Sequence, residues 1–170
     1  DLVDSKKNLE TLIKEIEDVV KNSFKEAYDE IDKNFNYMCK EILNNSIGNL
    51  SLLDETDLLE SGVELMVKFK NKKYQSLSLL SGGEKSMVAV ALIMAIFMYK
   101  PSPFTFFDEI EAALDESNTK RLLRKLKEFT DRSQFILITH NKHTMKESDQ
   151  LYGVTMNKEI GETKILSVVL

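Results

Sequence analysis

The sequence has one cysteine, no P-loop pattern and no apolar run long enough to span a membrane. Because Cys39 is the only cysteine in the sequence, it forms no disulfide within the chain. This fits a reducing compartment and predicts a small buried apolar residue. The longest apolar run, about 13 residues at 87–99, falls short of the ~20 that a bilayer requires and predicts a core helix. The N-terminal residues show no signal-peptide pattern.

The missing P-loop excludes one way of holding a nucleotide. That loop wraps a phosphate only if a lysine directly follows its last glycine. The segment Gly-Glu-Lys-Ser at 83–86 comes close, but Glu84 separates the glycine from the lysine. The chain therefore does not contain the phosphate-wrapping loop of a nucleotide site.

Length and charge set further limits. A chain of 170 residues is long enough for one domain with a sizeable core. The net charge of −5 gives no overall attraction to nucleic acid, so contact with DNA would need a local basic patch. Residues 71–74, Asn-Lys-Lys-Tyr, are the candidate. We interpret them as a solvated turn, with a nucleic-acid contact as the alternative.

One long helix is expected at the start of the chain. In residues 4–45 apolar side chains recur every three or four positions, and no proline or glycine interrupts them. Such a helix would be about 60 Å long, too long to lie on a core of this size. We expect its N-terminal part to project and pair with another helix, as in a coiled coil. A helix folded back into a bundle is the alternative.

A serine and two glycines stand directly before the apolar helix expected at 82–99. Ser81 is a good N-cap, because its hydroxyl can accept from a free amide of the first turn. Gly82 and Gly83 have no β-carbon, so a ligand can approach the backbone closely. The helix start also presents unpaired N–H groups and the positive end of its dipole. The segment predicts an anion site, most simply for phosphate; an ordinary capped helix is the alternative.

Strands that alternate with helices predict an α/β sheet with antiparallel additions. Pro101 and Pro103 end the apolar helix, a second helix is expected at 117–130, and a short helix precedes position 150. A hairpin turn is expected at 157–163, around Gly161. The expected strands are 50–53, 63–69, 104–107, 134–139, 150–156 and 164–170.

The apolar strand expected at 104–107 has the pattern of a buried parallel strand. It ends in Asp108 and Glu109, at the edge where parallel sheets place ligands. Asp108 is a candidate for Mg²⁺, which prefers oxygen ligands. Glu109 is a candidate to polarise a water for in-line attack on a γ-phosphate. Asp115 precedes a helix and is expected to cap it. His140 ends the neighbouring strand and is a candidate donor to a phosphate oxygen; a structural histidine is the alternative.

The order of these patterns resembles that of ABC-type ATPases, which carry a signature motif, a Walker B strand with a catalytic glutamate, a D-loop and a switch histidine. More narrowly, the chain resembles the C-terminal head of the SMC (structural maintenance of chromosomes) proteins. The residues that carry this resemblance are LSGGEK at 80–85, KPSPF at 100–104, DEIEAALD at 108–115, THNK at 139–142 and LYGVTM at 151–156. The chain departs from the family where Ile110 and Glu111 replace the commoner Val-Asp, and where Ser86 and Met87 follow the signature.

The resemblance implies an α/β fold that is the C-terminal lobe of an ABC-type P-loop ATPase head. Residues 1–45 would form the coiled-coil neck helix and residues 46–170 the lobe. In that family an N-terminal lobe carries the Walker A loop, so this chain would begin within the coiled coil and supply half a nucleotide site. The N-terminal lobe would complete the site, and the heads would dimerise around two ATP molecules with Mg²⁺.

The resemblance also assigns roles. Ser81, Gly82 and Gly83 would contact the γ-phosphate held by the opposite head. Asp108 would hold the metal of its own head, where Glu109 and His140 would be catalytic, and Asp115 would lie near the dimer seam. The cofactor-binding residues would be Ser81, Gly82, Gly83, Glu84 and Asp115.

The implied function is ATP-driven chromosome condensation, segregation and DNA organisation in the cytoplasm, at the chromosome. Implied partners are the N-terminal lobe, a second head, a kleisin subunit and DNA, but no membrane. A coiled-coil ATPase of DNA-break repair is the alternative, and a transporter domain would lack the long first helix. A scaffold with a degenerate ATPase fold is a third reading, against which the intact Ser81, Asp108, Glu109 and His140 argue.

Overall fold

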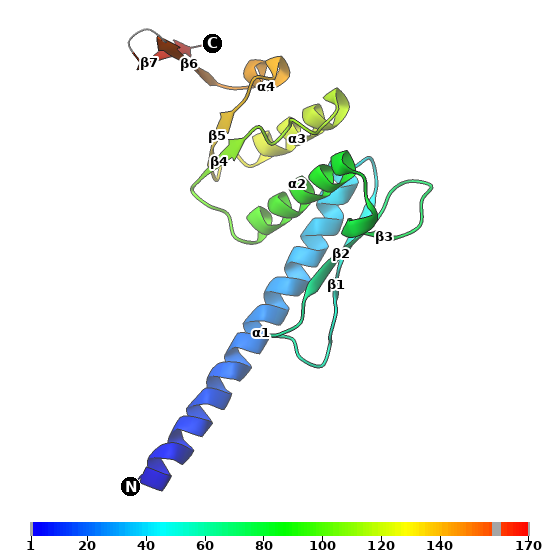
Figure 1. Cartoon of the computed structure of the whole chain (residues 1–170), viewed down its shortest axis with the longest axis vertical. Helices are drawn as coiled ribbons and strands as arrows, with labels where there is room; N and C mark the ends of the chain where they lie inside the picture. The colour runs from blue at the N-terminus through cyan, green and yellow to red at the C-terminus, as the bar shows by residue number, and fades with distance from the viewer. Residues whose placement is uncertain (1, 158–160, 170) are drawn as a thin grey trace. The chain divides into compact units, whose positions relative to one another are not determined.

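The computed structural model describes residues 2–157 and 161–169, and it divides into two compact units, Asp1–Ser102 and Pro103–Leu170. Figure 1 shows the long first helix, the strands and the shorter helices. The sequence-based boundary at residue 45, between a neck helix and a lobe, stays a prediction. The boundary between the compact units instead falls between the two prolines that follow the apolar helix.

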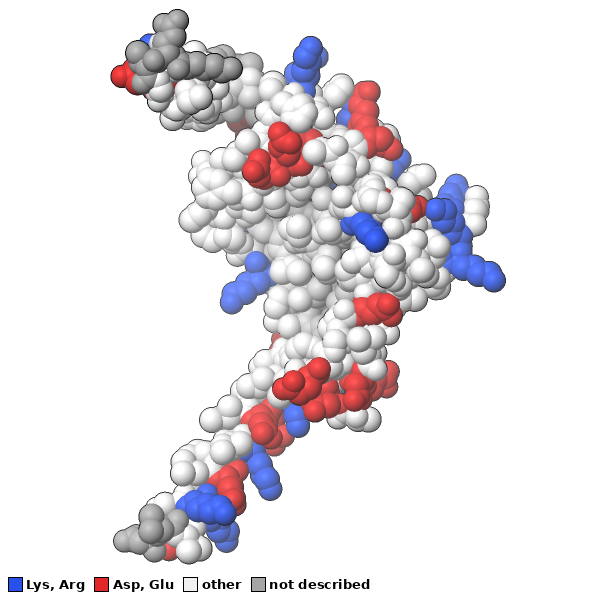
Figure 2. Space-filling view, in the orientation of Figure 1, with Lys and Arg blue, Asp and Glu red and all other residues white. Residues whose placement is uncertain are grey.

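The first unit begins with α1 (Leu2–Ile42), the long helix that the periodicity predicts. Residues 3–23 are all exposed, and charges of both signs lie along this part of the helix (Figure 2). One face of the last two turns is buried, with Phe35, Met38 and Ile42 at 0% exposure. Cys39 is buried beside them, as predicted, and this burial raises the pKa of its thiol to about 12.

A small antiparallel sheet follows, in the order β1 (Ile47–Leu52), β2 (Val63–Lys68) and β3 (Gln75–Ser76). It rests on α1 where Gly48 allows close approach: a β-carbon there would lie 2.5 Å from the Cys39 sulfur. The predicted strands at 50–53 and 63–69 correspond to β1 and β2. The sequence pattern missed β3, a strand of only two residues, and the 3₁₀ turn after it.

The apolar helix α2 (Gly82–Tyr99) spans the residues predicted for it and packs against α1. By length and composition alone it is also able to cross a membrane, a test that core helices of globular proteins pass as well. The Asn34 side chain of α1 donates to the Ala95 carbonyl of α2 over 3.4 Å. The buried residues of α2 are Val88, Val90, Ala91, Met94, Ala95 and Phe97. This burial identifies α2 as a core helix, as predicted.

The second unit contains two parallel strands, β4 (Phe104–Asp108) and β5 (Gln134–Ile138). In chain order, α3 (Glu116–Glu128) connects the two strands, and α4 (Lys142–Lys146) follows β5. The expectation of a buried β4 holds for one face only. Phe107 is 7% exposed and its ring stacks on Phe135 at 6.0 Å, whereas alternate residues on the other face stay exposed. The exposed face comprises Phe104 (54%), Phe106 (61%), Ile136 (37%) and Ile138 (57%).

The last two strands, β6 (Gln150–Asn157) and β7 (Glu162–Val169), pair antiparallel. The register brings Gln150 opposite Val169 and Asn157 opposite Glu162, so both predicted strands are present as a hairpin. Residues 158–160 of the predicted hairpin turn lie outside the described residues. Gly161 has a φ of +67°, a backbone conformation that favours glycine.

Candidate functional site

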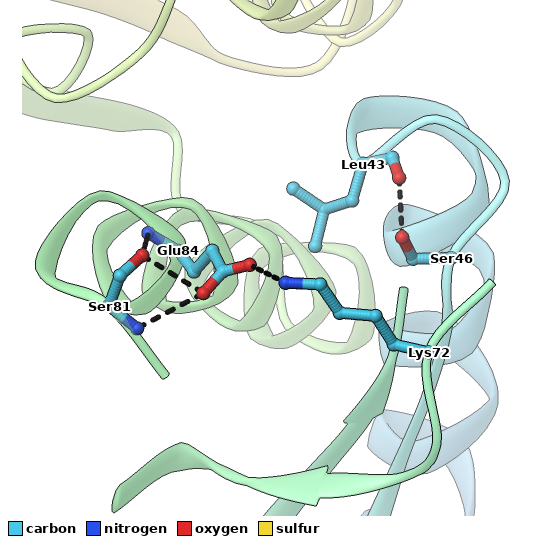
Figure 3. Close-up of polar contacts among 5 residues, drawn as sticks. All are labelled: Leu43, Ser46, Lys72, Ser81 and Glu84. Atoms are coloured by element: carbon cyan, nitrogen blue, oxygen red, sulfur yellow. Dashed lines mark hydrogen bonds and ion pairs between the residues drawn. The ribbon is translucent and has the colours of Figure 1, made fainter. Parts of the chain in front are cut away.

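The predicted site residues fall in two separate regions, one in each compact unit, which we call the two halves of the candidate site. The first half is the start of α2, where Ser81 and Glu84 hydrogen-bond to each other (Figure 3). The Glu84 amide donates to the Ser81 hydroxyl over 3.4 Å, and the Ser81 amide donates to Glu84 Oε2 over 3.0 Å. The Ser81 hydroxyl donates to the same carboxylate oxygen over 2.9 Å. This reciprocal arrangement is a capping box. The predicted N-cap is therefore present.

The glycines of the signature lie within this helix start. A β-carbon at Gly82 would meet no atom within 4 Å. Glycine weakens a helix by about 1 kcal/mol relative to alanine. Among residues 2–157 and 161–169, neither packing nor backbone geometry therefore explains glycine at this position, whereas a ligand that approaches the backbone would.

Lys72 completes this half of the site, and the sequence analysis missed it. Its ammonium lies 2.7 Å from Glu84 Oε1, opposite the oxygen that faces Ser81 (Figure 3). The same ammonium lies 5.5 Å from the Phe69 ring centroid. The Lys72 hydrogen bond, followed by those from Ser81, lowers the pKa of the Glu84 carboxyl to about 2. The predicted turn at 71–74 thus contributes an ion pair to the helix start.

The second half of the site lies at the carboxyl ends of β4 and β5. The Glu109 amide donates to the Ile138 carbonyl over 2.9 Å, and the Glu109 carboxylate lies 3.1 Å from His140 Nδ1. Both side chains are exposed, His140 at 79% and Glu109 at 51%. Glu109 has a φ of +46°, in the left-handed region where a residue with a β-carbon is strained. The strand before His140 pairs with the Asp108 strand, as predicted, but it ends at Ile138, two residues before His140.

A buried carboxylate, also missed by the sequence analysis, lies beneath this pair. Glu111 is 5% exposed and accepts hydrogen bonds from the hydroxyls of Thr139 and Thr144, the latter over 2.9 Å. The Asn141 amide in turn donates to the Thr139 hydroxyl over 2.9 Å. The three side chains link the turn after β4 to the turn after β5 and to α4. No local pattern pairs residues 28 or 33 positions apart.

The remaining predicted residues lie nearby in the second unit. Asp115 caps α3, as predicted, by accepting from the Asn118 amide over 2.7 Å. Asp108 is the last residue of β4 and its side chain is exposed. The strand ends form a small pocket of about 100 Å³, lined by Glu109, Glu111, Ala112, Leu114, His140 and Asn141. A larger hollow of about 770 Å³, between α3, β5 and α4, contains none of the predicted site residues.

The described residues bear on the metal prediction in one respect. Within residues 2–157 and 161–169, no three His, Cys, Asp or Glu side chains gather into a metal cluster. Mg²⁺ is commonly held by one or two carboxylates together with substrate phosphates and water. The exposed Asp108 at a strand end fits that kind of site.

Comparison with solved structures gives the class of protein: the fold is that of an SMC head domain, the ABC-type ATPase domain of these proteins. The chain superposes with a TM-score of 0.85 and 35% identity on the Smc head with an extended coiled coil, bound to the C-terminal domain of ScpA, derived from Pyrococcus furiosus. The superposition covers 96% of this chain and 41% of the Pyrococcus furiosus chain. A structure from work on ATP-driven dimerization and DNA-stimulated activation of SMC ATPases gives a TM-score of 0.79 at 34% identity, covering 87% of this chain and 89% of that one.

Sequence comparison gives the family. A model of the RecF/RecN/SMC N terminal domain matches residues 4–162, and the chain belongs to this family. A similar curated protein is the chromosome partition protein Smc of Fusobacterium nucleatum subsp. nucleatum, 64% identical over 167 residues. That match covers 98% of this chain but 14% of the relative, so the chain spans about one-seventh of the relative's length.

Proposed function

We propose that this chain is the C-terminal half of an SMC ATPase head that acts in chromosome partition. Together with an N-terminal lobe it would bind ATP and hydrolyse it, and ATP would join two heads. The similarity to a chromosome partition protein along nearly the whole chain favours this function over DNA-break repair. We accordingly place the protein in the cytoplasm, at the chromosome.

The observation that carries the proposal is the contact between Glu109 and His140 at the ends of two parallel strands. The strained backbone of Glu109 costs about 1–3 kcal/mol, and such strain gathers at functional sites. In this position the Glu109 carboxylate would accept a proton from the attacking water. His140, 3.1 Å away, would orient that carboxylate and donate to a phosphate oxygen.

The start of α2 would hold the terminal phosphate of the nucleotide on the opposite head. Ser81 and Gly82 lie at the positive end of the helix dipole, where backbone N–H groups face outward. Gly83 and Glu84 belong to the same helix start, and Asp115 would lie near the seam between heads. ATP bound in this way would join the heads, because neither half binds it fully alone.

Asp108 would hold Mg²⁺ together with phosphate oxygens and water. When bound, the ion would neutralise charge that develops on the phosphates during transfer. Asp108 is exposed at the end of β4, where phosphate oxygens and water could reach its carboxylate.

Further parts of the protein would cover the apolar surfaces that this chain exposes. The exposed face of β4 and β5, with Phe104, Phe106, Ile136 and Ile138, suits an N-terminal lobe. The stripe on α1 suits the second arm of a coiled coil; its exposed residues include Leu9, Leu12, Ile13, Ile16 and Val19. A kleisin subunit and DNA are further proposed partners.

Glu109→Gln in the full-length protein tests the catalytic assignment. We expect hydrolysis to fall by about 100-fold or more, because general-base catalysis typically contributes that much. ATP binding and ATP-driven association of heads should remain. Glu116→Gln, which removes an exposed carboxylate of α3, is the control. Hydrolysis by Glu109→Gln at the unmutated rate would overturn the assignment.

Ser81→Arg tests the role of the helix start in the opposite head. The larger cation would block close approach of a nucleotide to the backbone. We expect ATP-driven association to be lost while a single head still binds ATP, as measured by sedimentation and by nucleotide titration. Ser78→Arg, on the exposed turn before the helix, is the control. Association that survives Ser81→Arg would contradict the proposal.

A further inference from the structure

The contact between Glu109 and His140 is too exposed to fix its own geometry. Ion pairs and hydrogen bonds between solvated side chains contribute little, since water competes for both partners. His140 is 79% exposed and Glu109 is 51% exposed, yet their atoms lie 3.1 Å apart. Something other than this contact must therefore hold the two turns in register.

Glu111 is the buried group in a position to do so. It stands two residues after Glu109, while Thr139, which donates to it, directly precedes His140. Thr144, 1% exposed, donates to the same carboxylate oxygen and ties the pair to α4. One link joins the turn after β4 to the turn after β5, and the other joins it to α4. A shift of the turn after β4 would therefore break hydrogen bonds that are buried or partly buried, which is costly.

We propose that Glu111 is a positioning residue that sets the contact between Glu109 and His140 and thereby the rate of ATP hydrolysis. This inference rests on the proposed function. Glu111 touches neither nucleotide nor water in this role; it acts through the two turns that it joins. Small displacements matter here, since a misplacement of about 1 Å in an active site costs up to about 100-fold in rate.

The positioning role also depends on the length of the Glu111 side chain. An aspartate at this position would hold its carboxylate one methylene closer to the backbone. In this chain the carboxylate reaches hydroxyls from two different elements. We expect Glu111→Asp to lose at least one of these hydrogen bonds, and Glu111→Gln to keep both, because an amide oxygen also accepts.

Steady-state hydrolysis and ATP-driven head association are measured for full-length variants. We expect Glu111→Ala to lower kcat by about 10- to 100-fold, with apparent ATP affinity and association changed by less than about threefold, and Glu111→Gln to restore most of the rate. Glu147→Gln, an exposed carboxylate of α4 paired with Lys127, is the matched control. An unchanged kcat in Glu111→Ala would overturn the inference.

Repeating Glu111→Ala in a His140→Ala background distinguishes a general structural role of Glu111 from a role that acts through the His140 contact. If Glu111 acts through the His140 contact, the second change should lower kcat by less than about threefold, because coupled residues are not additive. An equal loss in both backgrounds would contradict the inference. If Glu111→Ala does not fold, Thr139→Val against Thr139→Ser makes the same comparison, and equal rates for those two would overturn it.

Failure of this inference is distinguishable from failure of the proposed function. Absence of ATP hydrolysis by the unmutated full-length protein, or full activity in Glu109→Gln, would overturn the function itself. A normal response of Glu109→Gln with no response to Glu111→Ala would overturn only the positioning role.

Discussion

The two halves of the candidate site are held by different forces. At the start of α2, Ser81, Glu84 and Lys72 form a network near the surface whose central element is an ion pair. At the ends of β4 and β5, a carboxylate only 5% exposed accepts from two hydroxyls beneath an exposed pair. The first network depends on charge, and the second on burial.

This difference predicts how each half responds to its surroundings. Salt and acid weaken interactions between partly exposed charges, so the helix start should be the half that responds to solution conditions. Buried hydrogen bonds are screened little and tolerate no lost partner. The strand ends should therefore be insensitive to salt and highly sensitive to side-chain geometry.

Gly82→Ala should give the largest effect that is confined to one half. A β-carbon at this position meets nothing within the chain, so alanine should raise stability by about 0.5–1 kcal/mol through helix propensity. The same methyl would stand where the proposed phosphate approaches, so ATP-driven association should fall by at least about tenfold, the equivalent of about 1.4 kcal/mol. Thermal unfolding and sedimentation with ATP measure the two effects.

Ala89→Gly, at an exposed position of the same helix, is the matched control. It should lower stability by about 1 kcal/mol and leave association unchanged. If Gly82→Ala stabilises the protein and association is also unimpaired, the glycine has no ligand-related role and the proposed phosphate site is wrong.

The sequence predicts a contact within these two halves well only when the residues that form it lie close together in the chain. The capping box joins residues three apart, Ser81 and Glu84, and the sequence analysis identified Ser81 as the cap and located the helix correctly. Lys72 was missed because the hairpin of β2 and β3, not a local pattern, brings it to Glu84. The parallel strands placed His140 beside Glu109, as predicted.

The buried carboxylate shows where local patterns stop being informative. From the sequence, Glu111 was only a departure from the family's commoner Val-Asp, because its partners lie 28 and 33 residues away. The exposure of Phe104 and Phe106 was missed for a related reason. An apolar strand predicts burial, but it does not say whether the covering layer belongs to the same segment of chain.

Removing one N-cap side chain from each half compares the two halves by the same kind of substitution. Ser81→Ala and Asp115→Ala each delete an N-cap side chain that accepts a backbone amide, and each should cost about 1 kcal/mol. Ser81→Ala should cost more, because Glu84 loses the hydroxyl that donates to it as well. Chemical denaturation measures both. A larger loss for Asp115→Ala would show that the capping box adds nothing to the single cap.

The smallest expected effect is a change in folding stability at low pH. The pKa of the Glu84 carboxyl is lowered to about 2 from its ordinary value of 4.5, chiefly by the Lys72 hydrogen bond. A lowered pKa in the folded state means that ionised Glu84 stabilises the fold fully above about pH 4.5, and that this contribution disappears as pH falls from about 4.5 to about 2.

The difference in melting temperature between the protein and Glu84→Gln should be constant at higher pH and vanish across that window. Lys72→Gln should raise the pKa of Glu84 toward 4.5 and narrow the window from its acid end. The pH dependence of the Glu84 carboxyl ¹³C resonance measures that pKa directly. A value near 4.5 in the unmutated protein would show that the ion pair does not govern this half of the site.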